Sequence, residues 1–149
     1  MTNKLQQIVN SQEQQQCAMR AGVAVHQRLG RVCFYPDGSA TGNADIVSKL
    51  RLNPELVEIM GILSKPEVPI AGFVKGKFIS RRIDRLYVNT DTKTVIILDY
   101  KTDKDKEQYY TKYTEQLKEY REILKMIYRH FCIQCKILWI NDFTLENIE

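Results

Sequence analysis

The sequence predicts an α/β fold, of an α+β-like kind, in which a central mixed β-sheet is flanked by helices. Three segments carry apolar residues at helical spacing, and four apolar segments bounded by turn residues have the character of strands. The predicted order is α, α, β, β, β, α, β. We expect the polar, Gln-rich residues 1–16 to form a tether or a frayed helix, and residues 17–149 to form a single domain.

Each predicted helix has its own signal. Residues 17–31 place apolar side chains along one side of a helix. Residues 52–63 begin with Asn53, a good N-cap, and Pro54, which suits the first helical position. Residues 106–131 step their apolar positions by three and four, which predicts a long helix facing a core. The turn-rich residues 34–44 between the first two helices predict a loop.

The strands are predicted at residues 67–74, 77–88, 92–102 and 132–140. The turn cluster NTDT separates the second from the third, so these two should form an antiparallel hairpin. The run VIILDY is apolar on both faces, which is typical of a strand buried in the middle of a sheet.

Charge is unevenly distributed along the chain. The net charge is +4, but residues 75–136 hold 15 of the 22 Lys and Arg and 9 of the 18 Asp and Glu, so this segment nets +6. Such a segment fits either a polyanionic partner or an ordinary solvated surface. The chain has no apolar run of membrane-spanning length and no apolar signal-peptide core near its start, so we expect a cytoplasmic protein that does not bind membranes.

The four cysteines predict neither a cluster nor a disulfide framework. Cys132 and Cys135 form a CxxC, but they lie in an apolar strand-like run, and Cys17 and Cys33 do not complete a set of metal ligands. We therefore expect core cysteines, with no iron–sulfur cluster.

Two carboxylates stand in the central strands. Asp84 and Asp99 lie within apolar runs, where an unpaired carboxylate is costly to bury, and the predicted hairpin brings their strands together. Lys101 follows Asp99 by two positions and so shares its face. Two carboxylates with a lysine could hold a hard cation and direct a water at a phosphodiester, but a structural Asp–Lys pair at a sheet end fits the spacing equally well.

Three further polar residues belong to predicted helices. Gln116 and Tyr120 are four apart and share one side of the long helix, and the Tyr120 hydroxyl needs a polar partner if it is buried. His26 lies in an otherwise apolar helix, and a lone histidine of this kind is more often a satisfied core residue than a ligand.

Four motifs follow one another along the chain: His26 in a G-x-x-x-H helix, I-D-R-L, L-D-Y-K-T and Q-L-x-x-Y. Together they resemble the RecB-type nuclease domain of the PD-(D/E)XK superfamily. Within it, the chain is most similar to the C-terminal nuclease domain of the bacterial double-strand-break repair helicase–nuclease subunit AddA. The likeness extends to NPEL, EVPI and KILWIND and covers roughly residues 18–142.

The resemblance implies a restriction-endonuclease-like core and a role for each matching residue. Asp84, Asp99 and the Tyr100 backbone carbonyl would hold Mg²⁺ or Mn²⁺, with His26 a further ligand or close to the metal, and Lys101 would be the catalytic lysine. Gln116 and Tyr120 would support the site and contact the nucleic acid backbone. Four basic residues would screen that backbone: Arg82, Arg85, Lys104 and Lys112. Glu67 falls where the family often has a glutamate and is a secondary candidate.

The chain departs from the family pattern in two ways. Arg81 stands where the family usually has glycine, and no G-x-x-x-x-G-K-[ST] loop is present, so the chain is not itself the helicase motor. We expect a metal-dependent, exonuclease-like deoxyribonuclease of bacterial double-strand-break repair and recombination, with DNA and a helicase subunit as partners. A weak or inactive DNA- or partner-binding module is the alternative. A structure-specific or defence endonuclease is a third hypothesis.

Overall fold

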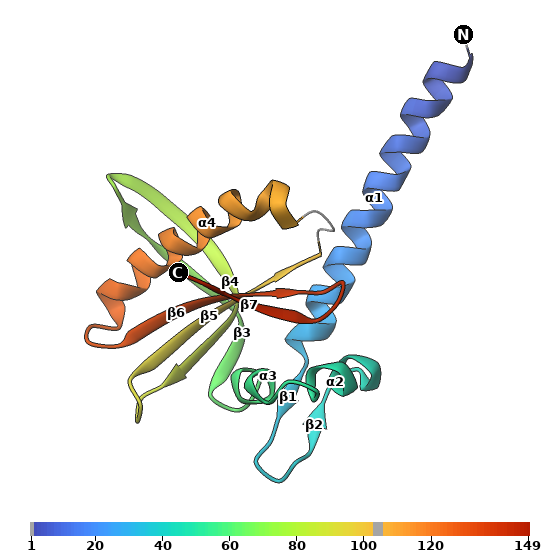
Figure 1. Cartoon of the computed structure of the whole chain (residues 1–149). Coiled ribbons are helices and arrows are strands. Elements are labelled where there is room, and N and C mark those ends of the chain that lie inside the picture. The colour runs from blue at the N-terminus through green and yellow to red at the C-terminus, as the bar shows by residue number, and fades with distance from the viewer. Residues whose placement is uncertain (1, 103–105) are drawn as a thin grey trace.

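The computed structural model describes residues 2–102 and 106–149, which form four helices, a small ribbon and a five-stranded sheet (Figure 1). The helices are α1 (Thr2–Gly30), α2 (Ala44–Leu50), α3 (Pro54–Ile59) and α4 (Lys106–Ile127). The ribbon pairs β1 (Cys33–Phe34) with β2 (Ala40–Thr41). The sheet consists of β3 (Ser64–Val74), β4 (Lys77–Asn89), β5 (Thr94–Lys101), β6 (Cys132–Trp139) and β7 (Thr144–Ile148). The predicted mixed sheet flanked by helices is confirmed.

The strands lie in the order β3-β4-β5-β6-β7. Neighbouring strands are antiparallel except β5 and β6, which run parallel. A parallel pair needs a crossover connection, and α4 supplies it. Residues 95–100 of β5 are all buried, so the prediction of a strand in the middle of the sheet is confirmed.

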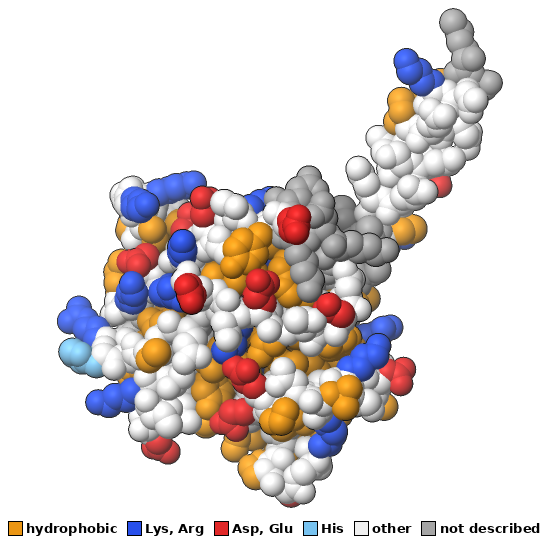
Figure 2. All heavy atoms as spheres, viewed as in Figure 1, with side chains coloured by type: hydrophobic (Ala, Val, Ile, Leu, Met, Phe, Trp, Pro, Cys, Tyr) orange, Lys and Arg blue, Asp and Glu red, His pale blue; other side chains and the backbone are white. Residues whose placement is uncertain are grey.

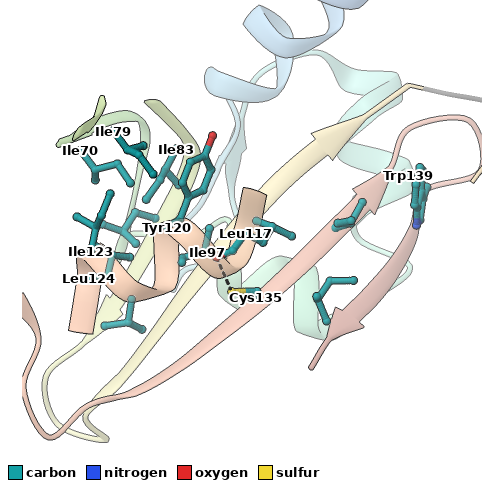
Figure 3. Close-up of a cluster of buried hydrophobic side chains, with 14 residues drawn as sticks. Ile70, Ile79, Ile83, Ile97, Leu117, Tyr120, Ile123, Leu124, Cys135 and Trp139 are labelled. Carbon is teal, nitrogen blue, oxygen red and sulfur yellow. Dashed lines mark hydrogen bonds between the residues drawn. The ribbon is translucent and has the colours of Figure 1, made fainter. Parts of the chain in front are cut away.

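Helices cover both faces of the sheet. On one face, α4 packs Leu117 and Ile123 over Ile83 and Ile97 (Figure 3). On the other face, the end of α1 together with α2 and α3 packs over Ile96, Leu98 and Tyr100. Alternate residues of β5 therefore belong to different cores, as the two-residue period of a strand requires. Among the described helices, none combines the length and apolarity needed to cross a membrane.

The predicted helices differ in extent from those observed, and the long helix predicted at 106–131 ends at Ile127. Residues 2–16, predicted as a tether or a frayed helix, form the first half of α1. Residues 3–16 are exposed, and this part of the helix stands clear of the remaining structure (Figures 1 and 2). The helix predicted at 52–63 is shorter, because the chain turns at Gly61 to enter β3. A helix over the whole of 52–63 would place Leu52 and Leu63 on one apolar side, but they lie outside α3 and are 85% and 42% exposed.

Some short elements were not predicted. Helix α2 lies in a region without strong periodicity, although its N-cap Asn43 accepts hydrogen bonds from two backbone N–H groups of its first turn. Strand β7 pairs with β6 beyond the last predicted element. Of the two CxxC cysteines, Cys135 is buried in the core, where its thiol donates to the Leu117 carbonyl. Cys132 is exposed.

Strands β4 and β5 separate partway along their length. They are paired from Asn89 and Thr94 to Arg85 and Leu98, and beyond that point β4 continues only with β3 as a long hairpin. The β3 pairing is itself interrupted opposite Asp84, where Glu67 has a φ of 53°. A gap therefore opens between β4 and β5 at Asp84.

Arg85 is buried at this point and joins four parts of the chain. It is 1% exposed. Its Nη2 donates to the carbonyls of Leu29 and Val32 at 3.0 and 2.9 Å, its Nη1 to Ser64 Oγ at 2.9 Å, and its Nε to the Tyr100 hydroxyl at 3.1 Å. A cation at the carboxyl end of α1 also opposes the negative end of the helix dipole.

We expect Arg85→Met to lower the free energy of unfolding by about 3 kcal/mol or more, because several buried acceptors would lose their donor. Urea unfolding measures this loss. Arg82→Met is the matched control on an exposed neighbour and should change stability by no more than about 0.5 kcal/mol. Equal losses in the two variants would contradict the role given to Arg85.

Candidate active site

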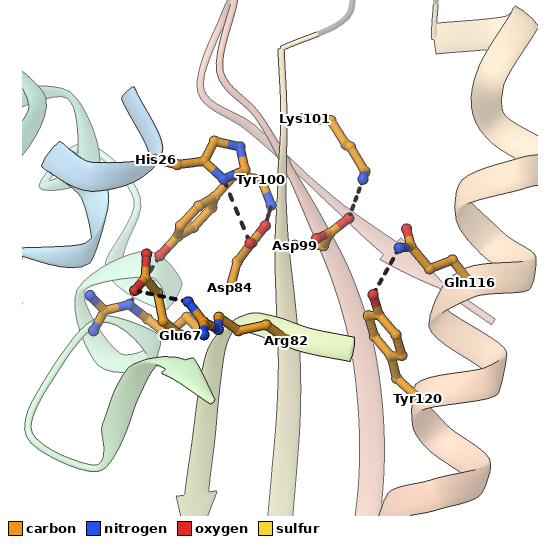
Figure 4. Close-up of polar contacts among 10 residues, drawn as sticks. His26, Glu67, Arg82, Asp84, Asp99, Tyr100, Lys101, Gln116 and Tyr120 are labelled. Carbon is orange, nitrogen blue, oxygen red and sulfur yellow. Dashed lines mark hydrogen bonds and ion pairs between the residues drawn. The ribbon is translucent and has the colours of Figure 1, made fainter. Parts of the chain in front are cut away.

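The gap between β4 and β5 brings together the two predicted aspartates (Figure 4). Asp84 Oδ2 accepts a hydrogen bond from the Tyr100 backbone N–H at 2.8 Å, so the carboxylate takes the place of a strand partner. Asp99 is the preceding residue of β5, and its carboxyl group lies close enough to that of Asp84 for each to shift the pKa of the other. The expectation that they meet near one end of the sheet is confirmed.

Lys101 lies beside Asp99. Its Nζ is 2.9 Å from Asp99 Oδ2, and the two side chains are 18% and 9% exposed. The same ammonium lies 4.2 Å from the centroid of the Tyr113 ring on α4. An ion pair on one side and an aromatic face on the other hold the lysine at the mouth of the gap.

The two aspartates differ in protonation. The pKa of Asp99 is raised to about 7, mainly by burial and also by the neighbouring Asp84 carboxylate, while Lys101 opposes the rise. Burial acts in the same direction on Asp84, but the nearby His26 and Asp99 side chains and the hydrogen bond from the Tyr100 N–H outweigh it, and the pKa of Asp84 falls below its ordinary value. Burial is thus the main cause that separates the pKa of Asp99 from that of an ordinary aspartate.

His26 approaches the pair from α1. Its Nδ1 is 3.6 Å from Asp84 Oδ1, a separation longer than a well-formed hydrogen bond, and its ring lies edge-on to the Tyr100 ring with centroids 5.5 Å apart. The interaction with Asp84 raises the pKa of His26, against the opposing effect of its burial. His26 is therefore a neighbour of Asp84, and its role as a ligand stays a prediction.

Tyr100 links the carboxylates to the structure below them. Its hydroxyl accepts from Arg85, and burial raises the pKa of the phenol to about 12. The next carbonyl, that of Lys101, faces β6 and accepts from the Ile140 N–H at 2.8 Å. Because the N–H and C=O of one strand residue point to the same side, the Tyr100 carbonyl faces the gap, as its N–H does.

Gln116 and Tyr120 line the α4 side of the site. Gln116 Nε2 donates to the Tyr120 hydroxyl at 2.8 Å, so the polar partner expected for this buried phenol is present. Burial raises the pKa of Tyr120 to about 12, and the charges of Asp99 and Asp84 add to the effect. Tyr120 therefore remains a neutral hydroxyl at physiological pH.

Two of the other site residues are placed differently from what the sequence suggested. Arg85 is buried against backbone carbonyls, so a direct contact with nucleic acid is corrected to support of the site from within. Glu67 is directed toward Arg82, with 3.9 Å between Oε2 and Nη1, and it does not join the aspartates (Figure 4). Both of these side chains are largely exposed, so their ion pair contributes little. Lys104 lies outside the described residues.

The sequence reasoning missed two residues near Lys101. Tyr113 has the spacing of a core residue of the long helix, but its ring also contacts the lysine. The signal was available, since Tyr113, Gln116 and Tyr120 follow one another at helical spacing. Arg81, noted only as a departure from a family pattern, lines a hollow of about 360 Å³ together with Lys101 and Gln116.

The donor set suits a hard divalent cation. Within the described part of the chain, no group of three or more His, Cys, Asp or Glu side chains forms a metal cluster. Two carboxylates and a backbone carbonyl nevertheless face one gap, and the buried Asp99 Oδ2 has no hydrogen bond. Asp99 Oδ2 and Lys101 Nζ are 2.9 Å apart and form an ion pair, but not a hydrogen bond. An unsatisfied carboxylate oxygen beside a second carboxylate is the arrangement that a cation would stabilise.

Comparison with known proteins does not assign the chain to a class. No protein-family model matches it, and no curated protein is significantly similar to it in sequence.

The raised pKa of Asp99 predicts how stability depends on pH. The unfolded carboxyl has a pKa near 4, so folding in EDTA takes up a proton between about pH 4 and about pH 7. The stability due to this group is present below about pH 4 and is lost as the pH rises through about 7. Asp99→Asn cannot lose a proton, so its melting temperature should rise relative to wild type across this window.

Thermal melts of both proteins in EDTA at a series of pH values measure this difference. Asp91→Asn, in the exposed turn between β4 and β5, is the control and should follow the wild-type curve. Parallel curves for wild type and Asp99→Asn would show that Asp99 titrates normally.

Proposed function

We propose that the chain is a metal-dependent deoxyribonuclease that hydrolyses phosphodiester bonds, with a core of the PD-(D/E)XK type. The observation that carries this proposal is the pairing of Asp84 with Asp99 at the gap between β4 and β5, with Lys101 2.9 Å from Asp99. The order of the surrounding elements, a helix, three antiparallel strands, a crossover helix and a parallel strand, supports it.

The chain's own residues divide the work of hydrolysis. Asp84 and Asp99 would hold a divalent cation with the Tyr100 carbonyl, and the cation when bound would stabilise the negative charge that builds on the phosphate. Lys101, fixed by Asp99 and Tyr113, would donate a hydrogen bond that orients the attacking water. The water oxygen bonds to phosphorus, one bond from phosphorus to a sugar oxygen breaks, and that oxygen takes up a proton. The products are a phosphate monoester and a hydroxyl.

The sequence resemblance supports a narrower assignment within this class. We propose an exonuclease-like activity on DNA ends in double-strand-break repair and recombination, beside a helicase subunit that supplies the motor. The alternative is a module that binds DNA or a partner without cleaving. The bulky Arg81 in place of a glycine favours this alternative, because it adds volume and charge next to Lys101.

A divalent cation should stabilise the folded protein, because it binds the native site and not the unfolded chain. At a concentration about 100 times its dissociation constant, Mn²⁺ contributes about 2.7 kcal/mol. For a domain of this size we expect a melting temperature about 5–10 °C higher than in EDTA. Asp84→Asn and Asp99→Asn should abolish the shift, whereas Asp91→Asn should keep it. A shift that persists in both site variants would place the cation elsewhere.

Cleavage assays test the activity itself. We expect the wild-type chain to degrade DNA with Mg²⁺ or Mn²⁺ and not in EDTA, and Lys101→Ala to lower the rate about 100-fold or more. Lys93→Ala, at the opposite end of the β4–β5 hairpin, is the matched control and should retain the wild-type rate. Linear and closed circular substrates distinguish an exonuclease from an endonuclease.

DNA binding without cleavage by either wild type or Lys101→Ala would support the binding module instead. Equal cleavage by the two would show that Lys101 has no catalytic role.

A further inference from the structure

A groove leads away from the aspartates between the β3–β4 hairpin and α4. It consists of two neighbouring hollows, of about 360 and 790 Å³, that share Glu115 and Glu119 in their linings. The smaller hollow begins at Lys101, and the larger one reaches Lys75 near the hairpin turn. The two hollows together extend from the candidate site toward the turn of the hairpin.

The two walls of this groove differ in charge. Every charged lining residue on the hairpin is basic: Lys75, Lys77 and Arg81. The α4 wall mixes both signs, and one of its lysines, Lys125, pairs with Glu122 at 2.9 Å. Figure 2 shows Lys and Arg side chains interspersed with Glu over α4 and the neighbouring hairpin. The groove as a whole is lined by more cations than anions, which suits a phosphate backbone.

The size of the groove suits one strand. Its hollows fall within the range of clefts that hold small molecules, which is too small for a duplex. From Arg81 to the turn at Lys75 the hairpin wall extends for about 15 Å, the length of about four stacked nucleotides. A duplex would have to be unpaired before one of its strands entered.

Arg81 stands where this groove meets the site. It is exposed on the face of β4 that α4 covers, three residues before Asp84, and its Nη1 donates to the carbonyl of its neighbour Ser80 at 2.9 Å. Among residues 2–102 and 106–149, no carboxylate lies within 4.0 Å of its guanidinium. A guanidinium without an ion-pair partner can bind a phosphate through two parallel hydrogen bonds.

We propose that this groove holds a single strand of nucleic acid, with Arg81 bound to the phosphate next to the one that reacts. This inference rests on the proposed function for the identity of the reacting phosphate, but binding of the strand itself does not require cleavage. The substitution of arginine for glycine then serves to grip substrate, and it does not mark a decayed site.

Binding of a short fluorescent single-stranded oligonucleotide in EDTA, followed by anisotropy over a series of salt concentrations, tests the proposal. We expect Arg81→Ala to weaken binding about five- to tenfold at about 0.1 M salt and to reduce the slope of log affinity against log salt by about one. Arg81→Lys should recover part of the affinity. Arg129→Ala removes the same charge in the turn after α4, and it should bind as wild type does. Arg81 is exposed, so its variants should fold, and thermal melts verify this.

Each outcome separates this proposal from the preceding one. Weakened binding by Arg81→Ala supports the groove even if wild type cleaves nothing. Identical binding by the Arg81 and Arg129 variants overturns it even if wild type is an active nuclease. A blunt duplex that competes as well as the single strand, or a wild-type chain that binds no DNA, also overturns it.

Discussion

The hydrogen bonds of the buried Arg85 guanidinium determine how the two halves of the molecule meet. Arg85 lies on β4, and its acceptors lie at the end of α1, just after α1, on β3 and on β5. These bonds therefore fix the carboxyl end of α1 against the sheet. His26 is one helical turn before the end of α1, so its position over Tyr100 depends on that junction. Tyr100 in turn accepts from Arg85 and donates to Asp84. The positions of Asp84 and His26 therefore depend on Arg85, which is buried.

The second constraint is electrostatic. At the point where β4 leaves β5, the Tyr100 N–H loses its strand partner and the Asp84 side chain replaces it. This arrangement satisfies the backbone but leaves Asp99 buried beside another acid, with one oxygen lacking a hydrogen bond. A protein selected for stability alone would have no reason to keep this pair, since an apolar residue in place of Asp99 would remove the cost of burying it. Local instability that the surrounding sheet and helices tolerate is typical of functional sites.

The sequence predicted the parts of the structure that depend on local patterns. The period of two in β5 and the hairpin turn before it were enough to bring Asp84, Asp99 and Lys101 together. Arg85 could not be placed in this way, because its carbonyl partners lie 53 to 56 residues away in the chain and nothing in R-R-I-D-R distinguishes a buried arginine from exposed ones. Glu67 was misplaced because its φ of 53° turns the chain out of the regular alternation. Short elements such as α2 and β7 have too few residues to show a period.

The edge of the sheet at β3 has a consequence for association between molecules. Pro66 and Pro69 both lie in this strand, and proline has no N–H to offer to a further strand. The positive φ at Glu67 between them breaks the regular row of backbone groups that an incoming chain would need. An exposed strand edge is otherwise a template for intermolecular pairing and aggregation. The same local irregularity that opens the gap at Asp84 thus also blocks the outer side of β3 against growth of the sheet.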